Sequence, residues 1–198
     1  MKKKASTLPN MLISLLVITL VAGLSLGFVN DLTAGPKAAA KLAKKINALK
    51  EVLPEFNNNP LDEVQLFASE KVKDSIEWYP ASQDEQFVGA AVVGSSDKGF
   101  NGLIKLMIGF NPSGEIIDIA VLEQKETPGL GTKIKEDLFL QQFRNKNPND
   151  FNLMVKKDGG DVDALTGATI TTRAFGEAVQ LAFDMYEEKN VPSQTKND

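Results

Sequence analysis

An uncharged, mainly apolar run over residues 11–29 constrains the fold of this 198-residue chain more than any other feature. Its length is close to the roughly 20 residues that an α-helix needs to cross a bilayer. A cleaved signal peptide is the alternative, but its apolar core is usually shorter, at about 7–15 residues. We therefore expect a retained transmembrane helix over residues 11–29.

Lysines lie on both sides of the run and decide its expected orientation. The three lysines within residues 1–10 and the terminal amine favour a cytoplasmic N-terminus by the positive-inside rule. Four further lysines follow the run, at Lys37, Lys41, Lys44 and Lys45, so the charges favour a cytoplasmic N-terminus only modestly. The prediction is a single-pass protein of the inner (cytoplasmic) membrane with its C-terminal domain on the outer side.

The chain contains no Cys and no His, and its net charge is −4. Thiolate iron–sulfur sites, disulfides, Cys nucleophiles, imidazole metal sites and His-based acid–base catalysis are therefore excluded. An acidic domain has no electrostatic reason to bind nucleic acid. Any redox chemistry must come from a bound organic cofactor, and we expect no catalytic side chain and no metal site.

Residues 30–60 are expected to form a juxtamembrane amphipathic helix and a linker. Apolar residues recur at helical steps over 36–53, at Ala39, Leu42, Ile46, Leu49 and Leu53. This helix either rests on anionic headgroups or a partner subunit, or packs on its own domain. Two prolines and three consecutive asparagines then break the chain over residues 54–60.

Residues 61–190 are expected to form a single α+β domain in which helices flank an antiparallel sheet. Three strand-like runs, at 87–93, 103–110 and 116–122, are joined by short turns that are typical of a meander. Helices are expected over 134–143 and 171–189, with a further strand at 151–155. A polar, flexible tail over 191–198 completes the chain.

A threonine-rich segment over residues 163–172 leads into the long helix at 171–189. A helix N-terminus offers unpaired N–H groups and positive potential, which suit a phosphate group. Gly167 and Ala168 let a bulky group approach, and the hydroxyls of four threonines can bind phosphate or be esterified to it. An ordinary helix cap is the alternative, since Thr and Asp are preferred cap residues.

A second segment, residues 126–133, follows an expected strand and contains Pro128, Gly129 and Gly131. Such a loop can lay backbone groups along a flat ring system, because glycine tolerates close approach and left-handed dihedrals. It is not a Walker A loop, since no Gly-Lys-Ser/Thr follows at the required spacing. A turn without any ligand is the alternative.

Together the two segments resemble the FMN-binding domain family, whose members include the G subunit of the Rnf complex and the C subunit of the sodium-translocating NADH:quinone reductase. The resemblance rests on Glu-Thr-Pro-Gly-Leu-Gly at 126–131 and Asp-x-x-Thr-Gly-Ala-Thr at 163–169. The compact chain is more similar to the Rnf protein. The resemblance implies an electron-transfer subunit with one covalent FMN, in a membrane complex that couples ferredoxin–NAD electron transfer to sodium or proton translocation. A quinone-reductase subunit, or a non-redox membrane-tethered assembly module, is the alternative.

The resemblance also implies site residues and partners. Thr169 would receive FMN through a phosphoester, and Asp163, Thr166, Gly167 and Ala168 would complete the motif read by a flavin transferase during maturation. The isoalloxazine would be lined by Glu126, Thr127, Gly129, Leu130 and Gly131. Other membrane subunits of the redox complex are the expected lasting partners.

Three of the aromatic residues outside both segments each have two interpretations. Trp78, Tyr79 and Phe100 could stack on a flavin ring, because aromatic faces suit planar groups. Packing in the core or on the surface is the alternative.

Overall fold

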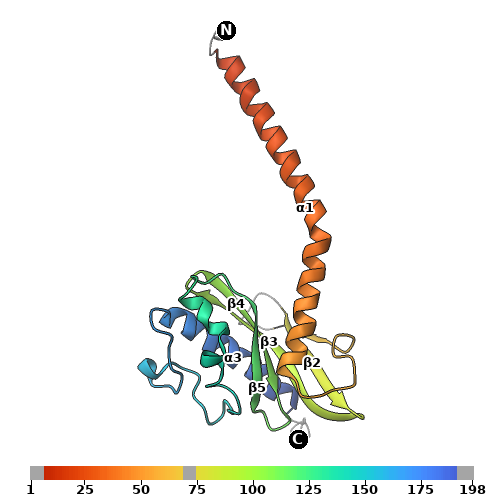
Figure 1. Cartoon of the computed structure of the whole chain (residues 1–198), viewed down its shortest axis with the longest axis vertical. Coiled ribbons are helices and arrows are strands. Elements are labelled where there is room, and N and C mark those ends of the chain that lie inside the picture. The colour runs from red at the N-terminus through yellow and green to blue at the C-terminus, as the bar shows by residue number, and fades with distance from the viewer. Residues whose placement is uncertain (1–6, 69–74, 191–198) are drawn as a thin grey trace, which may run out of the picture. The chain divides into compact units, whose positions relative to one another are not determined.

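The computed structural model describes residues 7–68 and 75–190, and the chain divides into two compact units, residues 1–44 and 45–198 (Figure 1). Helix α1 (Leu8–Val52) begins in the first unit and ends in the second. Among the described residues it is the one helix long and apolar enough to cross a membrane, with a mean hydropathy of 2.5 over its most apolar stretch.

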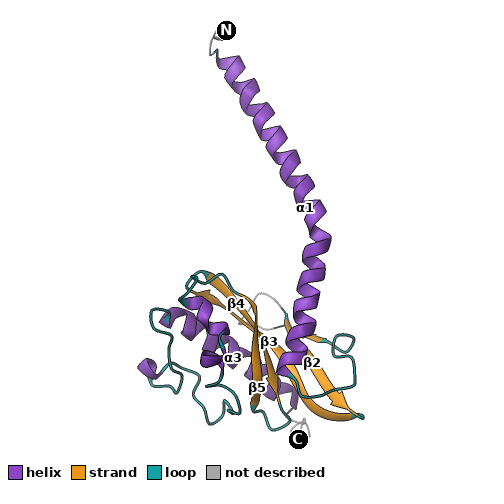
Figure 2. Cartoon of the chain, viewed as in Figure 1, coloured by secondary structure: helices purple, strands orange, loops and turns teal. Residues whose placement is uncertain are grey.

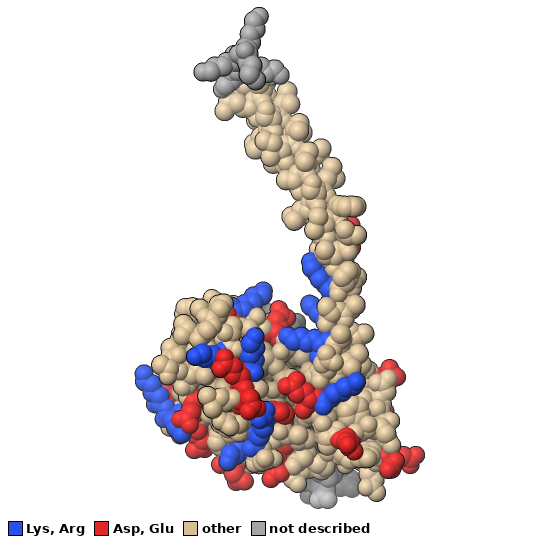
Figure 3. All heavy atoms as spheres, in the orientation of Figure 1, with Lys and Arg blue, Asp and Glu red and all other residues tan. Residues whose placement is uncertain are grey.

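The apolar part of α1 carries few polar groups, and two of its threonine hydroxyls return to the helix backbone. The Thr19 and Thr33 hydroxyls donate to the Leu15 and Val29 carbonyls one turn earlier. On the face drawn in Figure 3, this part of α1 shows an uncharged surface, and lysines gather only further along the helix. The expected transmembrane segment is therefore helical and uncharged, as a membrane span requires.

The second unit is built on a five-stranded antiparallel sheet with the order β1-β2-β3-β4-β5 (Figure 2). Its strands are β1 (Gln65–Phe67), β2 (Ile76–Gln83), β3 (Gln86–Gly99), β4 (Gly102–Phe110) and β5 (Ile116–Glu123). Helix α3 (Thr169–Asn190) is the long helix of this unit. The expected α+β class and the antiparallel meander are confirmed.

Helices cover both faces of this sheet. Helix α3 packs on the face formed by residues such as Val92, Leu106 and Ile108. The last turns of α1, with Leu49 and Val52, pack on the opposite face. Because both faces are buried, β3 and β4 appear in the sequence as nearly continuous apolar runs rather than as alternating ones.

A partly buried charge cluster holds the end of α1 to the sheet. Lys45 Nζ donates to Glu77 Oε2 of β2 at 2.6 Å, and the Tyr79 hydroxyl donates to the same oxygen. Burial raises the pKa of Glu77, but the hydrogen bonds from Lys45 and Tyr79 outweigh it, so this pKa lies below its ordinary value. The pair is therefore formed at neutral pH.

Two strands, β1 and β2, were not predicted; β1 is only three residues long, and β2 contains Pro80. A proline cannot donate to a neighbouring strand, so a run that contains one reads poorly as a strand. It is tolerated because β1 pairs with β2 only at residues 76–78, which leaves Pro80 at a free edge. The Pro80 carbonyl accepts instead from the Asn58 side chain at 3.0 Å.

Three other expected elements differ from the structure. The helix expected from Pro36 is continuous with the apolar run, as the bounds of α1 show. Residues 134–143 form only the short helices η1 (Gly131–Lys135) and α2 (Asp137–Leu140), because Glu136 takes an extended conformation with φ −79° and ψ 140°. Residues 151–155 make no strand, since Val155 forms one isolated parallel bridge to Val162 next to the short helix η2 (Lys156–Asp158).

Candidate functional site

The start of helix α3 is held by a threonine hydroxyl. Thr172 Oγ1 donates to the Ala168 carbonyl at 3.0 Å and accepts from the Leu165 N–H at 3.2 Å. Gly167 has φ +77°, which allows the sharp turn before the helix. The first-turn N–H groups of α3 are therefore presented at the end of a short, well-defined turn.

The loop after β5 is closed by its own hydrogen bonds. The N–H groups of Leu130 and Thr132 donate to the Thr127 carbonyl at 3.2 and 3.3 Å. Gly129 has φ +75°, and its N–H donates to Thr132 Oγ1 at 3.0 Å. The loop is thus a compact turn that leads directly into η1.

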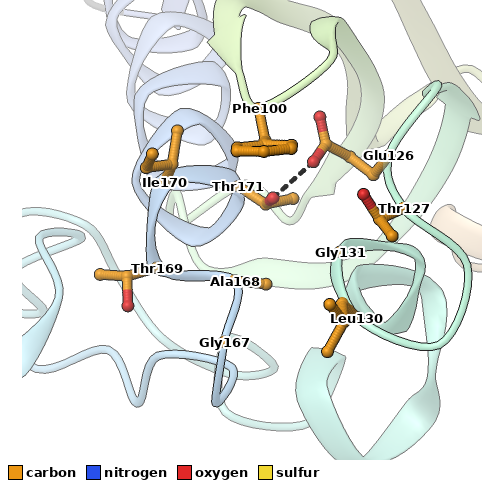
Figure 4. Close-up of a pocket in the computed structure, with 10 residues that line it drawn as sticks. All are labelled: Phe100, Glu126, Thr127, Leu130, Gly131, Gly167, Ala168, Thr169, Ile170 and Thr171. Atoms are coloured by element: carbon orange, nitrogen blue, oxygen red, sulfur yellow. Dashed lines mark hydrogen bonds between the residues drawn. The ribbon is translucent and has the colours of Figure 1, made fainter.

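Glu126 joins this loop to α3 and to the β3–β4 turn (Figure 4). Thr171 Oγ1 donates to Glu126 Oε2 at 2.5 Å, and the Asn101 N–H donates to Oε1 at 3.0 Å. Gly131 makes the approach possible, because a Cβ there would lie 2.8 Å from Glu126 Oε2 and 2.9 Å from Thr171 Oγ1. Two segments that are distant in the sequence therefore meet side by side.

A cavity of about 350 Å³ lies between the loop and the start of α3. This volume is within the range of pockets that hold small molecules. Three large apolar side chains at the cavity, Phe100, Leu130 and Ile170, are 45–64% exposed. The full lining consists of Phe100, Glu126, Thr127, Leu130, Gly131, Gly167, Ala168, Thr169, Ile170 and Thr171.

Residues 99–184 match the FMN-binding domain family. The chain is also similar to the G subunit of the ion-translocating oxidoreductase complex of Shewanella piezotolerans, with 33% identity over 195 residues that cover 93% of this chain and 92% of that protein. This chain belongs to the family of these G subunits. A second member, from the Na(+)-translocating ferredoxin:NAD(+) oxidoreductase complex of Acetobacterium woodii, is 30% identical over 184 residues, covering 87% of this chain and 88% of its own length.

A solved structure shows a weaker likeness. The C subunit of the Na(+)-translocating NADH-quinone reductase of Parabacteroides distasonis is 20% identical, with a TM-score of 0.49 over 77% of this chain and 85% of that one. A likeness of this size carries no argument about function.

Most of the site residues predicted from the sequence lie together at the cavity. From the loop these are Glu126, Thr127, Leu130 and Gly131, and from the start of α3 they are Gly167, Ala168 and Thr169. Gly129 shapes the turn but does not line the cavity.

Asp163 and Thr166 lie outside the cavity lining. The Asp163 carboxylate is exposed and accepts from Lys156 Nζ at 2.8 Å. The Gln142 side chain accepts from the Asp163 N–H at 2.8 Å, which fixes the backbone there. Thr166 is exposed in the turn before α3.

Sequence reasoning did not place Phe100 or Ile170 in the binding set, and it considered Thr171 only as one of four hydroxyls that can bind phosphate. Phe100 lies in the tight β3–β4 turn, which left its role ambiguous, and the structure places it at the cavity. Trp78 and Tyr79 are buried on opposite faces of the sheet, so both pack in the core. Among residues 7–68 and 75–190, no group of carboxylates is arranged to hold a metal ion.

The four threonine hydroxyls of the motif differ in their surroundings. Those of Thr171 and Thr172 are engaged in hydrogen bonds, and the two residues are 1% and 0% exposed. Thr166 is exposed but lies away from the cavity. Thr169 alone is partly exposed, lines the cavity and has a side chain without a hydrogen bond among the described residues.

Proposed function

We propose that this chain carries one FMN, and that it passes electrons within a membrane complex that couples ferredoxin–NAD electron transfer to sodium or proton translocation. The observation that carries the proposal is that the 126–131 loop and the start of α3 line one shared cavity. Both segments lie within residues 99–184, which match the FMN-binding domain family. Family membership supports the same function, because relatives are named as subunits of ion-translocating oxidoreductase complexes.

The residues at the cavity fit a flavin nucleotide. The start of α3 offers N–H groups and positive potential to a phosphate. Leu130, Ile170 and Phe100 offer apolar surface to a flat ring, and Gly131 keeps the loop backbone close to α3. The flavin would supply the electron-transfer chemistry, and the protein would supply binding, orientation and electrostatics.

Covalent attachment at Thr169 is the finer part of the proposal. Its hydroxyl is the one of the four that is both at the cavity and unengaged, which supports a phosphoester at this position. Asp163 and Thr166 are exposed and outside the cavity, so they suit recognition by a flavin transferase better than contact with the ring.

The function is tested by the flavin content of the protein purified from its native host. We expect a yellow protein with one FMN per chain that remains attached after denaturation, measured by absorbance and intact mass. A colourless protein of unmodified mass would instead support the non-redox assembly module. Replacement of the expected ferredoxin–NAD activity by quinone reduction in the same membranes would support the quinone-reductase complex.

The side of the membrane is a separate proposal. We place residues 1–10 in the cytoplasm, a transmembrane helix at 11–29, and the domain on the outer side of the inner membrane, because lysines precede the apolar run. Protease added to intact spheroplasts is therefore expected to digest residues 61–190, as measured by immunoblotting. A cytoplasmic marker should stay intact as the control, and full protection of the domain would contradict this orientation.

A further inference from the structure

Glu126 is the one charged residue among the buried residues of the described chain, with only 4% of its surface exposed. A carboxylate is costly to bury unless it is hydrogen-bonded or paired with a cation. Within residues 7–68 and 75–190, the ion pairs of lysine and arginine involve other carboxylates. The structure therefore keeps an anionic group at the cavity without a neutralising cation.

The position of this carboxylate is fixed from two sides. Thr171 Oγ1 of α3 and the Asn101 N–H of the β3–β4 turn each donate to one of its oxygens. These donors stabilise the charge and hold it in place without cancelling it. Figure 4 shows the carboxylate between Phe100 and Thr127 in the cavity wall.

We propose that Glu126 acts as a fixed negative charge that lowers the reduction potential of the flavin. The inference rests on the proposed FMN site. Reduction adds electrons to the ring, and a nearby negative charge disfavours that addition. The effect is large in a partly dry site, because charges interact more strongly there than in water.

The test uses Glu126→Gln in the full-length, flavin-loaded protein. Glutamine keeps the shape, and it can keep both hydrogen bonds: its carbonyl accepts from Asn101 while its amide donates to the Thr171 hydroxyl, which can also accept. The substitution thus removes charge and little else. We expect the midpoint potential to rise by the equivalent of a tenfold or greater change in the ratio of reduced to oxidised flavin, about 30 mV for a two-electron couple.

Glu136→Gln is the matched control. Glu136 is an exposed carboxylate in the same stretch of chain and does not line the cavity, so its removal should leave the potential unchanged. A Glu126→Gln protein with normal flavin content and an unchanged potential would overturn the inference.

Glu126→Asp separates the effect of the negative charge from that of the two hydrogen bonds. It also provides a test if the glutamine variant does not fold. Aspartate keeps the charge but is too short to keep both hydrogen bonds in place. A potential that stays near that of the unaltered protein supports the inference, whereas a tenfold shift upward overturns it. Absence of flavin from the unaltered protein would overturn the proposed function itself, and this inference with it.

Discussion

Replacing Thr169 by alanine is expected to abolish covalent flavin while leaving a folded protein in the membrane. The substitution removes the one atom that can form the proposed phosphoester. It removes no side-chain hydrogen bond among the described residues, and alanine is the better helix former at the start of α3. We therefore expect the free energy of unfolding to change by less than about 0.5 kcal/mol. In-gel flavin fluorescence after denaturation measures the attachment.

Thr169→Ser is the matched control, because it keeps a hydroxyl at the same position. It should retain fluorescence, and thermal denaturation should show that both variants are folded. Fluorescence that persists in Thr169→Ala would place the bond on another hydroxyl. Thr166 would then be the first to examine, since Thr171 and Thr172 are buried and already hydrogen-bonded.

The central part of the fold followed from local patterns. The three strand-like runs became β3, β4 and β5, and the expected apolar face of the long helix is buried in α3. These elements are apolar and bounded by turn residues, so periodicity and turn chemistry agree. The turn dipeptides at Asn101-Gly102 and Ser113-Gly114 mark the two connections.

The wrong predictions at residues 134–143 and 151–155 share a cause, which is that tertiary contacts overrode the local pattern. Phe139 and Phe143 have helical spacing, yet they reach the core because each ring packs against Phe175 at 5.1 Å between ring centroids. No continuous helix is needed for that contact. Similarly, Leu153 and Val155 alternate as in a strand, but the backbone at Lys156 bonds to Val162 in its own loop and not to the sheet.

The site was predictable as two segments but not as a set of contacts. Motif resemblance named both the loop and the start of α3, and nothing local indicated that Glu126 bonds to Thr171, which is 45 positions away. Phe100 was equally hard to assign, since only the sheet register brings the β3–β4 turn to the cavity. The roles of Asp163 and Thr166 in maturation remain predictions.

Replacing Gly131 by alanine is expected to reduce electron transfer through the complex by about 10–100-fold, the scale of an ångström-size misplacement at a reactive site. The added methyl group would lie 2.8 Å from Glu126 Oε2 and 2.9 Å from Thr171 Oγ1. These are closer than ordinary contacts, so the loop must move away from α3. The flavin ring would then lose its proposed wall while the attachment at Thr169 survives, because the transferase motif at 163–169 is unchanged.

Gly129→Ala is the matched control for Gly131→Ala, because it lies in the same loop. A Cβ at Gly129 meets nothing within 4 Å, but the residue has φ +75°, so alanine there costs about 1–2 kcal/mol of backbone strain. It should therefore lower the melting temperature while leaving the flavin absorbance spectrum and electron transfer nearly normal. Gly131→Ala should change the spectrum and the turnover at equal flavin content. Equal turnover in the two variants would show that close approach at Gly131 does not position the ring, and that the loop acts only as a turn.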